Sequence, residues 1–518
     1  MSLTHGLHRA MQQRPNAVAT ICAGRRRSFA ELGDRVARLA GALRALGMRD
    51  DDRIGILSLN SDRYLESYLG VYWGGGAVNP INIRWSAAEI AYSLDDCDTT
   101  VLIVDDKFKH AAADLQARSK GLRTIIYADD GATPEGMLSY EALIAQHAPI
   151  ADAQRRGNDL AGVFYTGGTT GFPKGVMLSH GGMVSNALAG VAEGIAAEGF
   201  IALHAAPMFH LADVFFTNAG LLRGGTHVFI PGFDTLLALQ TIQDEKVTEI
   251  GMVPLMIQLL VDHPQARDHD LSSVQQVLYG GAPISEAVLD RALKAMPPAR
   301  FYQAYGMTEL SPAATILPPY DHTPEGRERG KIRSGGRATF GVDVRIVNAD
   351  GNEVPRGQVG EIAARGPNVM LGYWNKPSET AAALRGGWMH TGDGGRMDED
   401  GFVFVVDRIK DMIVTGGENV YSIEVENALA HHPAIAACAV IGVPDEQWGE
   451  RVHAIVVLKP GASASGDELI AHCKERIANY KCPRGVEFRD ALPVSGAGKL
   501  LKAQLRAPFW EGRDRGVA

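Results

Sequence analysis

Short apolar runs rich in β-branched residues alternate with helical segments along this 518-residue chain, and the alternation strongly limits its fold. In the first third, strand-like runs at 53–59, 77–83 and 100–104 are separated by helical runs at 61–73 and 86–94. Strand, helix and strand at this interval are typical of a parallel sheet covered by helices.

One helix can be located from its cap. Ser28 and Glu31 have the spacing of a capping box, and the apolar series that follows has helical spacing and ends at Gly47. The members of this series are Leu32, Val36, Leu39 and Leu43. A second alternating series is predicted from 200 to 301, with strands near 201–205, 226–230, 249–253 and 276–279.

The pattern changes after residue 335. Short strands and glycine turns, such as those at 342–347 and 361–364, indicate a small β subdomain. The charged segment 407–411 then marks a domain boundary. Beyond it the chain has its own pattern of helix, strand, strand and helix, over 422–431, 435–441, 452–458 and 466–478.

We therefore predict an α/β fold with two domains. Residues 1–407 form a large N-terminal domain of helix-covered, mostly parallel sheets with the β subdomain, and residues 408–518 form a small α+β domain.

A glycine- and threonine-rich segment, Tyr165 to Gly175, follows the apolar run 160–165. It cannot form a stable helix, because glycine is too free and Pro173 lacks a donor. Exposed backbone N–H groups, threonine hydroxyls and the charge of Lys174 suit a polyphosphate, although a flexible turn is the alternative. A kinase or GTPase loop needs glycine before the lysine and a hydroxyl after it, so that class is disfavoured.

Composition excludes several partners. The net charge of -9, without a long basic run, argues against nucleic acid. The one tight basic cluster, Arg25-Arg26-Arg27, is interpreted as a solvated hairpin turn. The five cysteines include no C-x-x-C pair, which suits a reducing compartment and excludes a cysteine-based metal site.

The sequence also predicts a cytoplasmic location. The first residues lack the features of a signal peptide, and no run of eighteen apolar residues occurs. Peripheral membrane contact and a homodimer stay open.

Three further clusters contain residues that could bind a ligand or take part in catalysis. Tyr305 to Glu309 places a carboxylate on a turn, where it could hold Mg²⁺ beside a polyphosphate or simply be exposed. Trp388 to Asp393 ends in one acid that could accept two ribose hydroxyls, or be ordinary turn chemistry. Lys499, flanked by glycines, could be solvated or could reach a developing negative charge.

In this order the motifs resemble the adenylate-forming (AMP-binding) superfamily of acyl-CoA synthetases, luciferases and peptide-synthetase adenylation domains, over nearly the whole chain. The matching motifs are Tyr165 to Gly175, Gly280-Gly281-Ala282-Pro283, Tyr305 to Glu309, Tyr373-Trp374-Asn375, Gly387 to Asp393, Asp407 to Asp411, and Lys499.

The resemblance implies a mobile C-terminal domain with Lys410 at the hinge, and ATP, Mg²⁺ and coenzyme A as cofactor and co-substrates. It also implies a role for each matching residue. The β- and γ-phosphates would be held by the glycine loop, namely Thr166, Gly167, Gly168, Thr169, Thr170, Gly171 and Lys174. The adenine would be held by Gly281, Ala282, Pro283 and Tyr305.

The remaining implied roles follow the chemistry. Thr308 would reach the α-phosphate, Glu309 would hold Mg²⁺, and Lys499 would meet the acyl carboxylate and the α-phosphate. The ribose would be bound by Asp393 and Arg408, and Gly417 would lie along the coenzyme A channel.

Two residues depart from the family pattern. Gly167 stands where the loop usually carries serine, and Ala497 stands where threonine is usual near the terminal lysine. We expect altered ATP binding rather than its loss, with a nucleotide-binding pseudoenzyme as the alternative.

The segment Pro207 to Asp213 resembles the stretch that lines the acyl pocket. Amino-acid-activating relatives place aspartate where His210 stands, which argues against an amino acid, although Asp213 lies near and His210 could be structural. His210 is therefore included among the candidate catalytic residues.

The expected pocket is apolar and roomy, with Ala282, Ala304, Ala313, Ala314, Phe209, Val214 and Phe215 as its candidate lining. The predicted enzyme is an ATP-dependent ligase joining a medium- or long-chain fatty acid, or an aryl or alicyclic acid, to coenzyme A. The alternative is an adenylating enzyme that passes the acyl group to a carrier protein or to oxygen; no carrier-protein segment follows Lys499, which favours the ligase.

Overall fold

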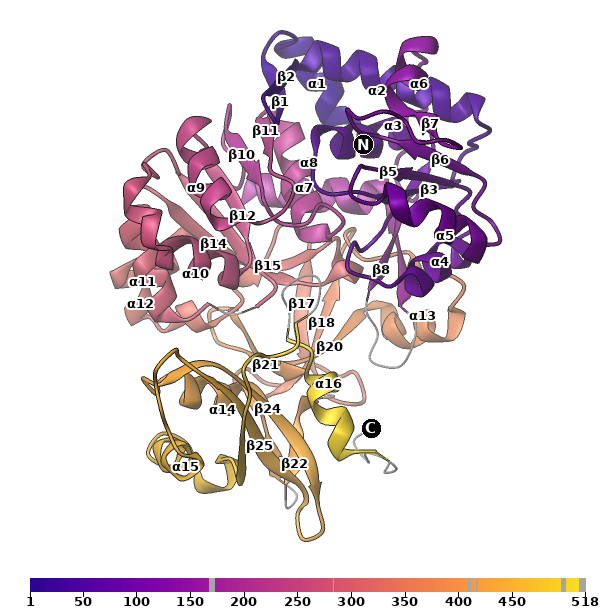
Figure 1. Cartoon of the computed structure of the whole chain (residues 1–518). Helices are drawn as coiled ribbons and strands as arrows, with labels where there is room; N and C mark the ends of the chain where they lie inside the picture. Colours follow the sequence, from indigo (N-terminus) through magenta and orange to yellow (C-terminus); the bar gives the residue numbers. More distant parts are fainter. Residues whose placement is uncertain (167–172, 283, 409–410, 416–417, 495–499, 512–518) are drawn as a thin grey trace. The chain divides into compact units, whose positions relative to one another are not determined.

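The computed structural model of the chain describes residues 1–166, 173–282, 284–408, 411–415, 418–494 and 500–511. The chain divides into two compact units (Figure 1). The first comprises Met1–Val344 and Ala364–Met389, and the second comprises Arg345–Ala363 and His390–Ala518. The division crosses the expected β subdomain, and the boundary between residues 407 and 408 stays a prediction.

Two large sheets form the frame of the first unit. The nine-stranded sheet has the order β16 (Arg337–Ala338), β15 (Ala313–Leu317), β14 (Arg300–Gly306), β13 (Gln276–Gly280), β12 (Glu249–Met252), β10 (Ile201–His204), β11 (Thr226–Phe229), β1 (Val18–Cys22) and β2 (Arg25–Ser28). The eight-stranded sheet has the order β19 (Gly372–Tyr373), β9 (Lys174–Ser179), β8 (Leu160–Thr166), β4 (Ala77–Pro80), β3 (Arg53–Leu57), β5 (Val101–Val104), β6 (Thr124–Tyr127) and β7 (Leu138–Ser139).

Both sheets are parallel at their centres and antiparallel at an edge. Strands β10 to β14 pair in parallel, whereas β15 runs antiparallel to β14. In the other sheet β3, β4, β5 and β8 pair in parallel, and β9 runs antiparallel to β8. The predicted α/β class with mostly parallel sheets is confirmed.

Helices cover these sheets, and Figure 1 shows α9, α10 and α11 grouped beside the strands β10 to β14. The helices of the first unit are α1 (His5–Gln13), α2 (Phe29–Ala45), α3 (Asp62–Trp73), α4 (Ala87–Asp96), α5 (Ala112–Arg118), α6 (Tyr140–Gln146), α7 (His180–Ala192), α8 (Leu211–Arg223), α9 (Thr235–Asp244), α10 (Pro254–Asp262), α11 (Glu286–Ala295), α12 (Pro324–Glu328) and α13 (Pro377–Ala383).

Helix α2 begins where its capping box predicts. The Ser28 hydroxyl accepts from the Glu31 amide at 3.2 Å, and the Glu31 carboxylate accepts from the Ser28 amide at 2.7 Å. The four apolar residues of the predicted helical series are buried, and Gly47 has a φ of +98° just beyond the helix. A left-handed residue after the last turn is the usual glycine stop of a helix.

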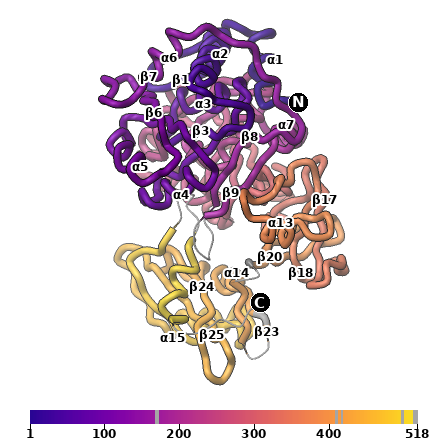
Figure 2. The backbone as a smooth tube through the Cα atoms, turned by 90° about the vertical axis from the view of Figure 1, so that its right-hand side faces the viewer, coloured from indigo at the N-terminus to yellow at the C-terminus, as the bar shows by residue number. Residues whose placement is uncertain are grey.

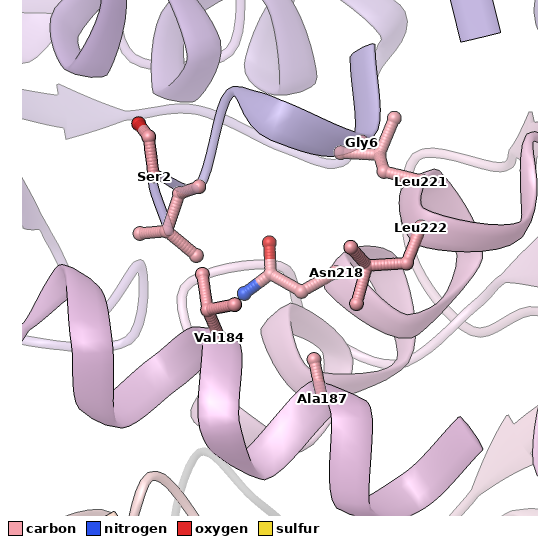
Figure 3. A pocket seen from close by; sticks show the side chains of 8 residues that line it. Ser2, Gly6, Val184, Ala187, Asn218, Leu221 and Leu222 are labelled. Carbon is pink, nitrogen blue, oxygen red and sulfur yellow. The ribbon is translucent and has the colours of Figure 1, made fainter. Parts of the chain in front are cut away.

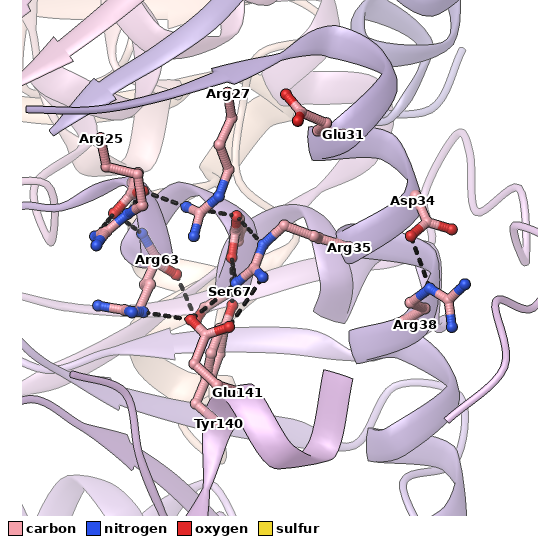
Figure 4. A network of polar contacts seen from close by, with 12 residues as sticks. Arg25, Arg27, Glu31, Asp34, Arg35, Arg38, Arg63, Ser67, Tyr140 and Glu141 are labelled. Carbon is pink, nitrogen blue, oxygen red and sulfur yellow. Dashed lines mark hydrogen bonds and ion pairs between the residues drawn. The ribbon is translucent and has the colours of Figure 1, made fainter. Parts of the chain in front are cut away.

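The arginine cluster is not a solvated turn, so that interpretation is wrong. Strand β2 carries it beside α3, where Arg25 and Arg27 both bond to the fully buried carboxylate of Asp62 (Figure 4). Arg27 also pairs with Glu66 at 3.0 Å. A hairpin does form, but its arginines point to acids that are distant in sequence, which a local pattern does not reveal.

The second unit holds most of a four-stranded sheet and all of a five-stranded sheet. Their strands are β17 (Asp343–Val347), β18 (Gly360–Arg365), β20 (Met389–Met397) and β21 (Val403–Arg408), then β22 (Ile413–Thr415), β23 (Glu418–Val420), β24 (Ile435–Asp445), β25 (Gly449–Leu458) and β26 (Gly485–Phe488). Its helices are α14 (Ser422–Ala430), α15 (Gly466–Lys474) and α16 (Lys502–Arg506). Figure 2 shows β24 and β25 side by side as a long hairpin with α14 against it.

Candidate active site

The predicted phosphate loop connects two antiparallel strands. Thr166 ends β8, Lys174 begins β9, and the two residues are partners in the strand register. The first flank is fixed by Tyr165, whose hydroxyl donates to an Asp96 carboxylate oxygen at 2.6 Å. Residues 167–172, which include Gly167, Gly168, Thr169, Thr170 and Gly171, lie outside the described residues.

The second flank is connected to two other motifs. Strand β19 pairs with β9, and the Lys174 ammonium lies 5.1 Å from the centre of the Tyr373 ring. The Tyr373 hydroxyl donates to Glu309 Oε1 at 2.8 Å. The neighbouring Trp374 donates its indole N–H to the Asp96 carbonyl at 2.7 Å. The structure therefore brings the loop flanks, the Tyr-Trp-Asn motif and the Thr-Glu motif together.

Glu309 is suited to hold a cation. It lies in the short helix η3 (Thr308–Leu310) after β14 and is 5 % exposed, while Thr308 is half-buried. Burial and then the Glu309 carboxylate raise the pKa of Tyr373, so this phenol stays protonated and donates. Mg²⁺ takes one or two protein carboxylates with phosphate oxygens, and one oriented carboxylate beside a predicted phosphate loop fits that requirement.

The predicted adenine residues lie at the carboxyl ends of two neighbouring strands. Gly280 of β13 pairs with Ala304 of β14, so Gly281 and Tyr305 follow side by side. A Cβ atom at Gly280 would lie 2.5 Å from the Ala304 carbonyl oxygen, and Gly281 has a φ of +78°. Gly281 and Ala282 are exposed, Tyr305 is half-buried, and Pro283 lies outside the described residues. Carboxyl ends of parallel strands are where such sheets bind ligands.

The predicted ribose residues lie on two neighbouring strands of the second unit. Asp393 of β20 and Arg408 of β21 are antiparallel partners, and Asp393 is 7 % exposed. Three predicted residues of this unit, Lys410, Gly417 and Lys499, lie outside the described residues.

The expected acyl segment joins β10 to α8. His210 precedes α8, is half-buried, and its ring centre lies 4.4 Å from that of Phe209. Asp213 is buried, and its carboxylate contacts His204 and Thr217, so the structure gives it a different use from pairing with an ammonium group.

The expected pocket lining divides between two apolar clusters. Phe215, Ala313 and Ala304 pack with Phe200, Phe216 and Tyr302, whereas Phe209, Val214 and Ala314 pack in the large core of the first unit. Sequence patterns did not predict three residues that contact these motifs or the chain next to them. Asn60 donates to the Ala206 carbonyl, Tyr68 donates to the Met208 carbonyl, and Asp96 accepts from the Tyr165 hydroxyl. No local signal marks them, because each lies more than sixty residues from its partner.

The cavity in Figure 3 is a different place. It lies between the N-terminal segment, α7 and α8, and has a volume of about 10 Å³. This is room for about one water molecule, so the cavity is too small for a nucleotide or an acid. Its lining consists of Ser2, Leu3, Gly6, Val184, Ala187, Asn218, Leu221 and Leu222.

Two family models match this chain. The model of the AMP-binding enzyme covers residues 7–374, and that of the AMP-binding enzyme C-terminal domain covers residues 424–499. The chain belongs to the AMP-binding enzyme family. The predicted resemblance is therefore confirmed.

Similar proteins agree with this membership. Feruloyl-CoA synthase of an Amycolatopsis species is 41 % identical over 506 residues, which is 97 % of this chain and 98 % of the relative. The fatty acid–[acyl-carrier-protein] ligase ScoC of Streptomyces coeruleorubidus is 35 % identical, over 98 % of this chain and 96 % of the relative. ATP-bound MatB from Rhodopseudomonas palustris has a TM-score of 0.88 at 30 % identity, over 98 % of this chain and 99 % of that structure.

These findings confirm the predicted class of enzyme, an AMP-forming acid–thiol ligase of the acyl-CoA synthetase type. They also confirm ATP, Mg²⁺ and coenzyme A as the cofactor and co-substrates of its reaction. Among the described residues, no helix is long and apolar enough to cross a membrane.

Proposed function

We propose that this AMP-binding enzyme activates an aryl carboxylic acid of the hydroxycinnamic kind and transfers the acyl group to coenzyme A. The observation that carries the proposal is the contact series from Lys174 through Tyr373 to Glu309, since it joins a predicted phosphate loop to a carboxylate suited to Mg²⁺. The choice of an aryl acid is supported by the likeness to feruloyl-CoA synthase. A medium- or long-chain fatty acid is the second candidate. The likeness to ScoC, whose name gives a fatty acid as its substrate, supports a fatty acid without indicating its chain length.

An amino acid is a poorer candidate. The aspartate nearest to His210 along α8 is Asp213, and its two carboxylate oxygens lie 3.0 Å from His204 Nδ1. This carboxylate already has a buried partner, which favours an acid without an ammonium group.

In the first half-reaction, a carboxylate oxygen of the acid attacks the α-phosphorus of ATP and the bond to pyrophosphate breaks. Two anions must approach each other, so groups that neutralise phosphate oxygens lower the barrier. We assign Thr308 and Lys499 to the α-phosphate, and Thr166, Lys174 and residues 167–171 to the β- and γ-phosphates. Mg²⁺, when held by Glu309, supplies further positive charge to the phosphates.

In the second half-reaction, the thiol sulfur of coenzyme A attacks the acyl carbon, the bond between that carbon and the AMP oxygen breaks, and AMP and the thiol proton are released. We assign the adenine to Gly281, Ala282, Pro283 and Tyr305, and the ribose to Asp393 and Arg408. The two half-reactions need different groups at one centre, which a mobile C-terminal domain 408–518 with its hinge at Lys410 would supply. Gly417 would then line the coenzyme A channel.

Gly167 and Ala497 each remove a hydroxyl that the family usually carries, while Thr166 remains at the start of the loop. Altered ATP affinity with retained turnover is therefore proposed. A cytoplasmic location is proposed too, supported by five free cysteines. We also propose that the protein forms a homodimer and contacts a membrane peripherally.

The test is a substrate panel. Purified protein is given ATP and Mg²⁺ with ferulate, 4-coumarate, octanoate, palmitate, phenylalanine or acetate, with and without coenzyme A. Pyrophosphate release and thioester mass are measured in parallel. Thioester formation that is fastest with the hydroxycinnamates supports the proposal, and fastest turnover of a fatty acid supports the second candidate.

Two other outcomes would overturn the proposal. Pyrophosphate release without thioester at saturating coenzyme A would indicate transfer to a carrier protein or to oxygen. ATP binding without pyrophosphate release for any acid would indicate a pseudoenzyme.

A further inference from the structure

The segment 205–210 is here named the gate segment. Two residues that flank it, His204 and Asp213, form a buried side-chain pair. His204 ends β10 and Asp213 lies in the first turn of α8. The His204 Nδ1 atom lies 3.0 Å from both carboxylate oxygens of Asp213, and both side chains are almost fully buried. The two ends of the gate segment are thus joined by a side-chain contact in addition to the chain itself.

A second histidine contacts the His204 ring on its other side. His204 Nε2 lies 2.8 Å from His227 Nδ1, and burial followed by the proximity of His204 lowers the pKa of His227. A neutral His227 can donate from Nδ1 to His204, which then donates from its own Nδ1 to Asp213. His227 Nε2 has no hydrogen-bond partner within the described residues, which fits the unprotonated nitrogen of this arrangement.

Two side chains from other elements hold the middle of the gate segment. Asn60, beyond the end of β3, donates to the Ala206 carbonyl at 2.8 Å and accepts from the Met208 amide at 2.9 Å. Tyr68 of α3 donates its hydroxyl to the Met208 carbonyl at 3.0 Å. Both side chains are buried, at 6 % and 4 % exposed.

These contacts fix the backbone just before the side chains expected to meet the acid. Met208 has both its amide and its carbonyl bonded, and Phe209 and His210 follow directly. Buried hydrogen bonds of this kind leave the segment little freedom to shift, because a displaced Met208 would leave polar groups unpaired. We therefore expect Asn60, which follows β3 of the eight-stranded sheet, and Tyr68 of α3 to set the direction of Phe209 and His210.

We infer that Asn60 and Tyr68 are positioning residues for the acyl site, which fix the gate segment and thereby determine which acids the enzyme accepts. The inference rests on the proposed function, in which His210 and Phe209 line the acyl site. Both residues contact backbone groups of the gate segment, and neither is assigned to the reacting atoms. Their loss should therefore change the KM for the acid and the preference between acids, and leave the KM for ATP unchanged.

The protein offers a matched control on the same helix. Tyr72 lies four residues after Tyr68 on α3, is 2 % exposed, and its hydroxyl has no hydrogen-bond partner within the described residues. Tyr68→Phe and Tyr72→Phe each remove one buried hydroxyl from α3. Only the first removes a contact with the gate segment.

The experiment compares these variants in full-length enzyme, with the acid that the wild type uses best and one bulkier acid. Tyr68→Phe should raise the KM for the preferred acid about fivefold, the equivalent of one buried hydrogen bond, and change the ratio of kcat/KM between the two acids. Tyr72→Phe should change neither quantity. Asn60→Ala should act in the same direction as Tyr68→Phe and more strongly, since it removes two bonds to the segment.

The inference is overturned if Tyr68→Phe and Tyr72→Phe give the same KM and the same acid preference while wild type is active. It is also overturned if the KM for ATP rises as much as that for the acid, because the change would then be general. If the wild type forms no thioester with any acid, the proposed function fails and the inference fails with it. Should Asn60→Ala not fold, the tyrosine pair still decides.

Discussion

The Tyr373 hydroxyl donates to Glu309 Oε1 at 2.8 Å, and the same tyrosine ring lies 5.1 Å from the Lys174 ammonium. One side chain therefore links a cation beside the predicted phosphate loop to the carboxylate expected to hold Mg²⁺. Tyr373 and Glu309 are 64 residues apart in the chain. Residues next to a metal ligand orient it, and their loss commonly weakens metal binding more than tenfold.

Tyr373→Phe is expected to raise the Mg²⁺ concentration needed for half-maximal pyrophosphate release by about tenfold, because Glu309 loses a donor that orients it. The measurement is a Mg²⁺ titration at saturating ATP. Tyr127→Phe is a matched control, since Tyr127 donates to the Asp106 carboxylate at 2.7 Å away from these motifs. Equal Mg²⁺ dependence in both variants would show that Tyr373 does not orient Glu309.

Lys499→Ala is expected to slow adenylation on the order of a hundredfold or more, since it removes a charge assigned to the α-phosphate. The measurement is acid-dependent pyrophosphate release without coenzyme A. Lys474→Ala, which removes an exposed lysine at the end of α15, is the control and should behave as wild type. Pyrophosphate release by Lys499→Ala at the wild-type rate would contradict the assignment.

Glu249 should make stability depend on pH. Burial raises its pKa from 4.5 to about 7 in the folded protein, where its carboxylate accepts from the Ala197 amide at 2.8 Å. Between these two pH values the folded state keeps a proton that the unfolded state has lost, so its contribution is complete below pH 4.5 and lost as pH rises through 7.

Glu249→Gln should therefore gain stability relative to wild type between pH 4.5 and 7, by on the order of 3 kcal/mol. Urea unfolding of both proteins at pH 5 and pH 8 measures this difference, and the comparison cancels groups that titrate in both. Parallel pH profiles would show that Glu249 is ionised in the folded state already at low pH.

Asp62→Asn should destabilise the first unit by about 3–5 kcal/mol, because Arg25 and Arg27 would lose a buried carboxylate. Asp34→Asn is the control. Asp34 pairs with Arg38 on the surface of α2 at 2.7 Å and is 52 % exposed, so its loss should cost less than about 1 kcal/mol (Figure 4). Unfolding midpoints in urea measure the loss of stability in each variant. Equal shifts would mean that the buried ion pairs of Asp62 stabilise the protein no more than the surface pair of Asp34.

Local patterns predicted much of the fold. The capping box at Ser28 and Glu31 fixes the start of α2, and the alternation of apolar runs predicts the order of strands and helices. These features depend on neighbours within one or two turns, so they can be read along the chain. Helix α15 ends at Lys474, four residues before the predicted end, and no local pattern in the sequence marks this end.

For the site residues, less could be predicted from local patterns than for the fold. The sequence supplied candidates from Thr166 to Lys499 through the resemblance, and their roles stay predictions. It placed Arg25 and Arg27 in solvent, whereas their partners Asp62 and Glu66 come from α3. The sequence also gave no reason to notice Asn60 or Tyr68, since nothing near them marks a contact with residues 206–208.

By itself the sequence determined the class of this protein: an α/β enzyme of the AMP-binding family with its motifs in a fixed order. Hydrophobic period, caps and glycine positions act over short distances and are written locally. Only the tertiary structure decided which side chains serve those motifs. Tyr373 reaches Glu309, and Asn60 and Tyr68 reach the gate segment, because pairing of distant strands and packing of α3 bring together residues that are far apart in the chain.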